Sequence, residues 1–166
     1  MNDAATCDVI IDVAVEASGW PGADALNARV AQAFAAAVSV GSLRYLPGSE
    51  LSLLFSDDAT VHDLNKKWRD QDKPTNVLSF PGGDESGPVY GPLLGDIVFA
   101  LETVEREAKE GDKPFENHLS HLIVHGILHL FGYDHQIEED AERMESLERR
   151  ILARLQIPDP YEGPFD

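Results

Sequence analysis

The segment from His125 to His135, HGILHLFGYDH, constrains this chain more than any other part of the sequence. His125 and His129 are four residues apart, so on a helix both imidazole rings project from one face. Gly132 favours a helix end, because glycine enters left-handed backbone conformations without a Cβ penalty, and the returning chain can bring His135 to the same point. Three imidazoles with no thiolate among them predict a catalytic site for one zinc ion that keeps a coordination position for water.

Two further histidines, His118 and His121, lie on the same stripe of the predicted helix. The rest of this helix is apolar nearly all round, which indicates that it is buried. Buried imidazoles need partners, and hydrogen bonds to backbone carbonyls in a core are the alternative to a metal. The clustering of five histidines within 118–135 favours a metal for His125, His129 and His135. We expect His118 and His121 to hold neighbouring groups, although His121 stays open as a competing ligand.

The spacing His-x-x-x-His-x-x-Gly-x-x-His is also that of a group of zinc proteases. Their motif has a glutamate directly after the first histidine, where it serves as the general base for attack of water on a peptide bond. This chain has Gly126 at that position, and glycine has no side chain to accept a proton. The sequence therefore predicts the metal geometry of these enzymes with a different bond as the target.

Three segments of the chain together resemble the YbeY family of bacterial endoribonucleases. They are the histidine segment itself, LNKKWR at 64–69 leading into DKPTNVLSFP at 72–81, and LGDIV at 94–98. They occur in the family's order and span roughly residues 50 to 155, which is most of the chain.

The resemblance implies a compact zincin-like α+β fold and a zinc-dependent endoribonuclease specific for single-stranded RNA. It implies a role in ribosomal RNA maturation, namely 16S rRNA 3′-end processing, and in ribosome quality control. The implied partners are the ribosomal particle or ribosome-associated proteins. Zinc is implied on His125, His129 and His135, and a catalytic role for Arg69. On position alone, an arginine between a helix and a strand favours a structural role. Chemically, a guanidinium suits the negative charge that builds on phosphate oxygens during cleavage.

The net charge of −17 is unusual for a protein that acts on RNA, because basic surfaces supply much of the affinity for phosphates. Two explanations stay open. One is that the acidic residues face away from the site, since 66–73 holds four of the 13 Lys and Arg residues. The other is that the RNA is delivered on a ribosomal particle or by a basic partner. Lys66 and Lys73 are the candidate substrate-binding residues.

Composition favours an ordinary globular protein. At 166 residues, with 43% hydrophobic and 26% charged residues, the chain is expected to form a single metal-dependent hydrolase domain over 1–166. Its one cysteine, Cys7, allows no disulfide within the chain and favours the reducing cytoplasm. No run approaches the about 20 apolar residues of a transmembrane helix, and no secretory signal is evident.

Hydrophobic periodicity predicts an α/β sandwich with a mixed sheet and the histidine helix packed on one face. In the helix that ends at Arg69, we expect Val61, Leu64 and Trp68 to form the buried stripe. The charges of the last helix are expected to form a solvated face, and the tail from about 158 to be loose. About four strands are expected at 8–16, 50–55, 76–80 and 96–100, and about five helices at 24–40, 57–69, 102–110, 115–131 and 137–156.

The sequence leaves the details of the reaction open. The proton acceptor is either the metal-activated hydroxide itself or Asp134, although a carboxylate at this position more often caps the backbone or holds a neighbouring histidine. The attacking group is either water or the RNA 2′-hydroxyl. Two rival functions also remain. One is a metallopeptidase or another zinc hydrolase, and the other is a non-catalytic ribosome-assembly factor in which zinc only stiffens the fold.

Overall fold

A computed structural model of the chain describes residues 9–71, 75–83, 89–133 and 137–161. Within them, the elements confirm the predicted α+β class, and each lies within a few residues of its predicted range. The largest difference is in β4, which begins at Leu93 and not at Asp96. The elements are β1 (Val9–Val15), α1 (Ala23–Gly41), β2 (Ser49–Ser56), α2 (Asp58–Arg69), β3 (Val77–Pro81), β4 (Leu93–Ala100), α3 (Leu101–Glu110), α4 (Phe115–Leu130) and α5 (Glu138–Arg154).

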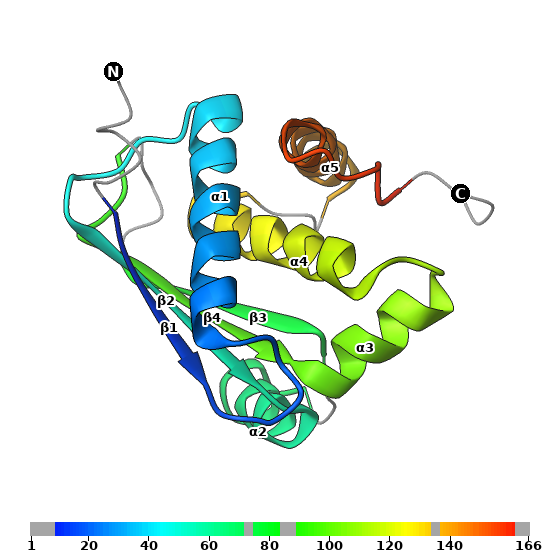
Figure 1. Cartoon of the computed structure of the whole chain (residues 1–166). Coiled ribbons are helices and arrows are strands. Elements are labelled where there is room, and N and C mark those ends of the chain that lie inside the picture. The colour runs from blue at the N-terminus through cyan, green and yellow to red at the C-terminus, as the bar shows by residue number, and fades with distance from the viewer. Residues whose placement is uncertain (1–8, 72–74, 84–88, 134–136, 162–166) are drawn as a thin grey trace.

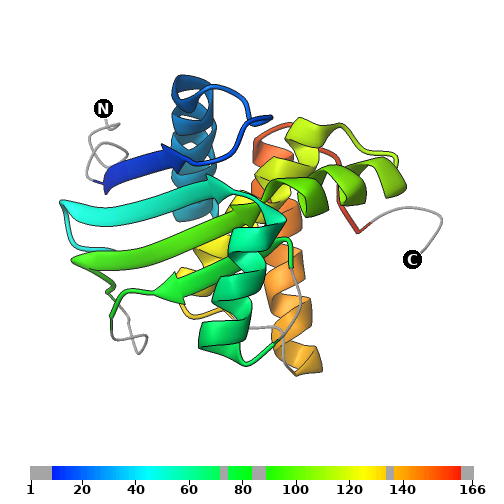
Figure 2. The ribbon, with the colours of Figure 1, turned by 90° about the horizontal axis from the view of Figure 1, so that it is seen from below.

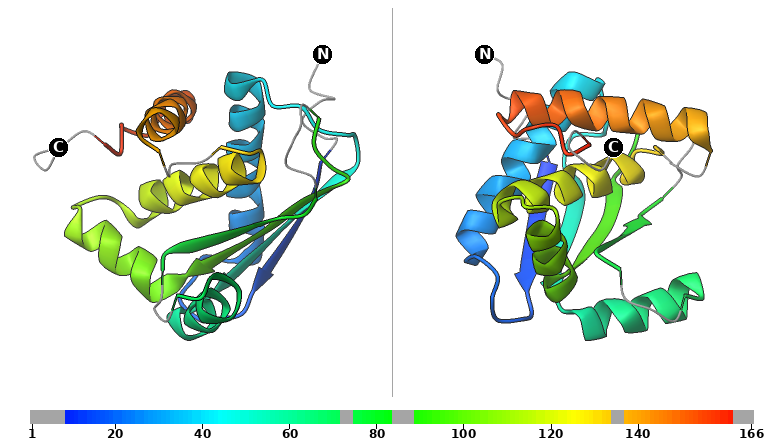
Figure 3. Two further views of the ribbon diagram at one scale, coloured as in Figure 1. Left: turned by 180° about the vertical axis from the view of Figure 1, so that it is seen from behind. Right: turned by 90° about the vertical axis from the view of Figure 1, so that its right-hand side faces the viewer.

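The described strands form one mixed sheet in the order β1-β2-β4-β3. Strands β1, β2 and β4 are parallel, and β3 pairs antiparallel with β4 at one edge. Helices α1 and α4 cover one face, and α5 packs on the far side of α1 and α4 (Figures 1 and 3). Helix α2 lies on the opposite face (Figure 2). The prediction of a mixed sheet with the histidine helix on one face is confirmed.

The main core lies between the sheet and α1, α4 and α5. Alternate residues of the two central strands point into it, as the period of two in a strand requires. The rings of Phe55 and Phe99 stack there with centroids 4.7 Å apart. Helix α4 is covered by the sheet on one side and by α1, α3 and α5 on the others, so its apolar residues are buried nearly all round, as predicted.

Helix α2 departs from the predicted burial. It begins after Asp57, whose carboxylate accepts a hydrogen bond from the Thr60 backbone N–H at 2.9 Å and so caps the helix. Val61 is fully buried, and Leu64 packs beside it against the outer face of the sheet. The prediction that Trp68 completes this stripe is wrong, because its side chain is 61% exposed. Trp68 lies on the last turn of α2, outside the cluster that Val61 and Leu64 form with β3 and β4.

Helix α4 approaches the sheet closely at Gly126. A Cβ atom at this position would lie 2.9 Å from Cγ2 of Ile97 in β4 and 3.2 Å from Oγ of Ser79 in β3. The Ser79 hydroxyl donates a hydrogen bond to the Gly126 carbonyl at 3.4 Å. The missing side chain therefore allows the close contact between α4 and the two strands, on the turn of α4 between His125 and His129.

We expect Gly126→Val to lower the free energy of unfolding by about 2 kcal/mol, because the added carbons overpack a contact with the fully buried Ile97. Urea denaturation measures the change. Glu116→Val, at an exposed position of the same helix, is the control and should change stability by less than about 1 kcal/mol. Equal loss of stability in both variants would contradict the packing role of Gly126.

Candidate functional site

Helix α4 brings His125 and His129 together as their spacing predicts. The centroids of the two rings are 4.6 Å apart, and the two Nε2 atoms are 3.1 Å apart. After Leu130 the helix ends, and Gly132 adopts a φ of 91°, in the left-handed region that favours glycine. The predicted helix end at Gly132 is therefore confirmed.

The outer nitrogen of each ring faces an acceptor. His125 Nδ1 donates to Oε2 of Glu148 at 2.6 Å, and His129 Nδ1 donates to the backbone carbonyl of Tyr133 at 2.9 Å. Because a carboxylate and a carbonyl only accept hydrogen bonds, each neutral ring carries its proton on Nδ1. Both Nε2 atoms then direct an electron pair at the same region. Two such electron pairs repel across 3.1 Å, and a cation between them replaces that repulsion with two attractive contacts, so the pair suits a metal ion.

Glu148 is the central residue of this site that the sequence analysis missed. It lies on α5, is fully buried, and bridges His125 to His121, whose Nε2 is 3.0 Å from Oε1. Burial alone would raise the pKa of this carboxyl, but hydrogen bonds from His121 and His125 outweigh burial and lower the pKa to about 2. The expectation that the charges of this helix are all solvated is therefore wrong for Glu148.

Tyr161 completes the environment of the carboxylate. Its hydroxyl donates a hydrogen bond to Oε1 of Glu148, and its ring packs edge-on against His121 with centroids 5.3 Å apart. Burial, followed by the charge of Glu148, raises the pKa of Tyr161 well above its ordinary value. The hydroxyl therefore stays protonated and can donate a hydrogen bond to the carboxylate.

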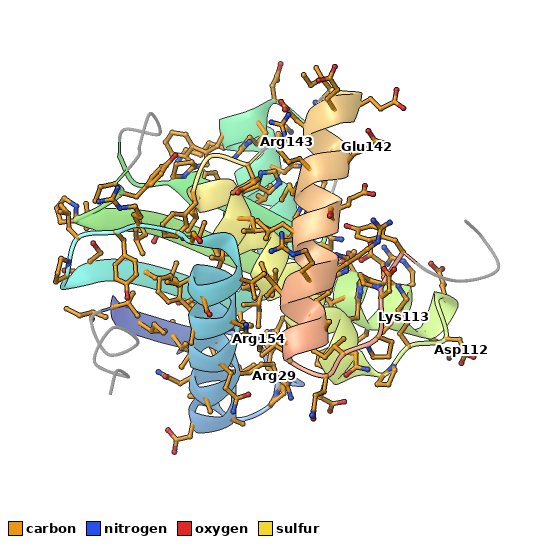
Figure 4. The ribbon with its side chains drawn as sticks, turned by 90° about the horizontal axis from the view of Figure 1, so that it is seen from above. Arg29, Asp112, Lys113, Glu142, Arg143 and Arg154 are labelled. Carbon is orange, nitrogen blue, oxygen red and sulfur yellow. The ribbon has the colours of Figure 1, made fainter. Side chains whose placement is uncertain are left out.

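The segment that carries Tyr161 packs on the protein, which corrects the expectation of a loose tail for residues 158–161. Lys113 donates a hydrogen bond to the Pro160 carbonyl at 2.9 Å and lies beside this segment (Figure 4). Arg149 pairs with Asp159 at 3.1 Å, and its guanidinium lies 5.2 Å from the centroid of the Tyr161 ring. The tail is thereby fixed against α5 and the loop before α4.

The remaining histidines of the stripe hold neighbouring groups, as expected. His121 directs its Nε2 at Glu148 and Tyr161, and its ring centroid lies 6.3 Å from that of His125. His118 pairs through Nε2 with Glu107 of α3 at 2.9 Å. Burial would raise the pKa of Glu107, but its hydrogen bonds from His118 and Asn76 lower it. These contacts fix α4 to α3 and α5 and leave His125 and His129 as the ring pair that meets.

Several predicted site residues lie outside the described part of the chain. His135 and Asp134 fall in 134–136, and Lys73 falls in 72–74. Among the described residues, no three metal-ligating side chains meet at one point. The donor set that is described, two imidazole nitrogens with fixed tautomers, fits two ligands of the predicted zinc site.

Arg69 lies at the end of α2 and contacts β3. Its guanidinium donates a hydrogen bond to the Ser79 carbonyl and lies 5.2 Å from the centroid of the Phe80 ring. Ser79 in turn contacts Gly126 between the two histidines. Strand β3 thus links the arginine to the histidine pair. Lys66 is exposed on the same helix.

Within the described residues, no helix is long and apolar enough to cross a membrane.

Comparison with known proteins gives consistent matches over most of the chain. The family described as Endoribonuclease YbeY matches residues 22–156. A protein named Endoribonuclease YbeY from Agrobacterium fabrum is 54% identical over 160 residues, covering 92% of this chain and 95% of that protein. Its namesake from Methylocella silvestris is 51% identical over 157 residues, covering 94% and 88%. The solution structure of TM1509 from Thermotoga maritima shares the fold, with a TM-score of 0.56 at 23% identity over 93% of this chain and 97% of that chain.

Glu148→Gln is expected to destabilise the fold by about 3 kcal/mol at neutral pH, because a neutral amide replaces a buried carboxylate that accepts hydrogen bonds from two histidines. The pKa of Glu148 is lowered from 4.5 to about 2 in the folded protein. Its ionised form therefore stabilises the fold above about pH 4.5, and this contribution is lost as the pH falls toward 2. The gap in unfolding free energy between wild type and variant should shrink over that interval in urea titrations.

The matched control is Glu142→Gln, since Glu142 is an exposed glutamate of the same helix that points away from the protein (Figure 4). It should shift stability by less than about 0.5 kcal/mol at every pH. A pH-independent gap for Glu148→Gln would contradict the assigned role of its charge.

Proposed function

Because this chain belongs to the YbeY endoribonuclease family, we propose that it is a zinc-dependent endoribonuclease that cleaves single-stranded RNA during ribosomal RNA maturation. The observation that carries the proposal is the pair of Nε2 atoms 3.1 Å apart, each on a ring whose Nδ1 donates to a fixed acceptor. We propose further that residues 1–166 form a single hydrolase domain and that the protein acts in the cytoplasm.

His125 and His129 would hold the zinc ion together with His135, which the sequence supplies six residues after His129. When bound, zinc supplies a Lewis acid for the phosphate and lowers the pKa of water toward about 7. Glu148 holds the His125 ring in one tautomer and one orientation, and the Tyr133 carbonyl does the same for His129. The two nitrogens are therefore oriented before any ligand arrives.

Arg69 would neutralise the charge that develops on the phosphate oxygens during cleavage. Its contact with the Ser79 carbonyl holds the guanidinium beside β3, the strand that packs on α4 at Gly126.

Phosphodiester cleavage fits the site better than peptide hydrolysis. A protease of this motif needs a glutamate at position 126. Any side chain there meets Ile97 and Ser79, beginning with a Cβ only 2.9 Å from Cγ2 of Ile97. A protease base at this position would therefore displace the contact of α4 with the sheet, and the RNA-directed reaction is favoured over the metallopeptidase alternative.

The ribosomal particle is the proposed partner that presents the RNA. With a net charge of −17, the protein gains little from long-range attraction to free RNA. Lys66 and Arg69 at the end of α2 would contact the RNA locally once it is presented, as would Lys73.

His129→Ala is expected to abolish stoichiometric zinc binding and cleavage of unstructured RNA, because it removes one of two oriented nitrogens. Metal analysis of purified protein and the rise in melting temperature on zinc addition measure binding independently of activity. His62→Ala, a histidine on α2, should retain both properties. Undiminished zinc content in His129→Ala would overturn the assignment of this ligand.

Arg69→Ala is expected to lower kcat for RNA cleavage by about 100- to 1,000-fold while zinc content and melting temperature stay unchanged. The exposed side chain lies outside the core, so its loss should spare the fold. Arg150→Ala, an exposed arginine on α5, is the control for loss of one positive charge. Retained cleavage in Arg69→Ala would exclude the catalytic role, and wild-type protein that binds zinc but never cleaves RNA would favour an assembly factor with structural zinc.

A further inference from the structure

A groove lies on the outer face of the sheet, on the side opposite α4. Its volume is about 490 Å³, which is within the range of about 300–1,000 Å³ that small-molecule sites occupy. Leu64 and Trp68 of α2 form one wall, and Phe80 of β3 lies on the floor. The exposed indole of Trp68 therefore lines an open apolar groove together with Leu64.

The strand registers divide the rest of the floor into two rows. One row is apolar and the next is polar, and both run across β1, β2 and β4. The apolar row consists of Ala14, Leu54 and Val98, and the polar row consists of Asp12, Ser52 and Asp96. A ligand that fits both rows is flat and apolar on its face and carries hydrogen-bond donors along one edge.

The charges around the groove indicate how such a ligand is oriented. Lys66, Lys67 and Arg69 flank Trp68 on the last turn of α2, and the Lys67 ammonium lies 5.3 Å from the centroid of the indole ring. This cationic end attracts phosphate. The carboxylates of Asp12 and Asp96 repel phosphate but accept hydrogen bonds from base amino groups.

We propose that this groove binds an unpaired base of the RNA substrate, stacked on Trp68, with the amino edge of the base toward Asp96 and its phosphate toward Lys66 and Lys67. Aromatic stacking beside a basic track is the usual means of binding single-stranded nucleic acid. The inference rests on the proposed function and adds to it a second contact, away from the histidine pair.

The groove and the histidine pair are linked by the edge strand β3. Arg69, next to Trp68, contacts the Ser79 carbonyl, and Ser79 contacts Gly126 of α4. Phe80 faces the groove while Ser79 faces α4, because successive residues of a strand point to opposite faces. An RNA strand that crosses the edge of the sheet at β3 can place one nucleotide in the groove and another at the histidines.

Tryptophan fluorescence tests the proposal directly. The chain has two tryptophans, and Trp20 is held inside by a hydrogen bond from its indole N–H to the Ser56 carbonyl and by the Phe55 ring. A short 2′-O-methyl oligocytidylate should quench the wild-type emission in a saturable way, and should leave the emission of Trp68→Phe, which retains only Trp20, unchanged. Trp68→Phe should keep most of the affinity, whereas Trp68→Ala should raise Kd about tenfold.

Leu46→Ala, an exposed apolar residue elsewhere on the protein, is the control and should leave Kd unchanged. Melting curves of all variants check that they fold. Asp96→Asn distinguishes a base from a phosphate over the polar row: weaker binding of oligocytidylate is expected, and tighter binding would overturn the proposal. Unchanged Kd in Trp68→Ala would also overturn it.

The outcome separates this proposal from the proposed function. Wild-type cleavage of unstructured RNA together with an unresponsive Trp68 would reject the base site and leave the nuclease intact. Loss of binding to ribosomal proteins in Trp68→Ala, with RNA affinity unchanged, would assign the groove to a protein partner and reject the base site as well. Quenching by oligocytidylate in a protein that binds no zinc would support the base site while the nuclease assignment fails.

Discussion

The buried carboxylate of Glu148 is the interaction on which the site depends. Removing an ionised carboxylate from water costs several kcal/mol, and only hydrogen-bond donors of good geometry offset that cost. Here the donors come from His121 and His125 on α4 and from Tyr161 in the tail. One carboxylate therefore joins α4, α5 and the C-terminal segment. Because Oε2 fixes Nδ1 of His125, the direction of Nε2 follows from how α5 packs, and not from α4 alone.

The close approach of α4 to the sheet is the second constraint, and it gives Gly126 two roles. From the sequence, Gly126 mattered because it cannot act as a base. In the fold it matters because any Cβ would meet Ile97 and Ser79. The two roles are physically connected. A helix that packs this closely on β3 and β4 brings Gly126 against the strand that Arg69 contacts, and a glutamate at the same position would have to displace Ile97 or Ser79.

The local parts of this structure could be predicted from the sequence, and the parts set by packing could not. The four-residue spacing of His125 and His129 fixes their shared face, and Gly132 ends the helix, because both effects act within one turn. Glu148 was misassigned because a glutamate on an amphipathic helix is ordinarily solvated. Its spacing from Met144, Leu147 and Ile151 places it on the buried stripe, which was the available signal. No comparable pattern marks Tyr161, and the helical spacing of Trp68 from Val61 and Leu64 does not distinguish its exposed side chain from theirs.

The net charge of −17 is compatible with a local cationic contact surface, because surface charges act only over short distances. Surface charges act over about 8 Å at physiological ionic strength, so the net charge of −17 discourages approach of free RNA but does not decide contacts at the surface. On the last turn of α2, Lys66, Lys67 and Arg69 surround an exposed indole, and under the proposed function these residues would contact a strand of RNA that reaches β3. Under the proposed function, such a surface would favour RNA that another particle holds in place. Repulsion would then lower the rate of unproductive encounters with other RNA, while the short-range cations and the aromatic ring would act on the strand that is presented.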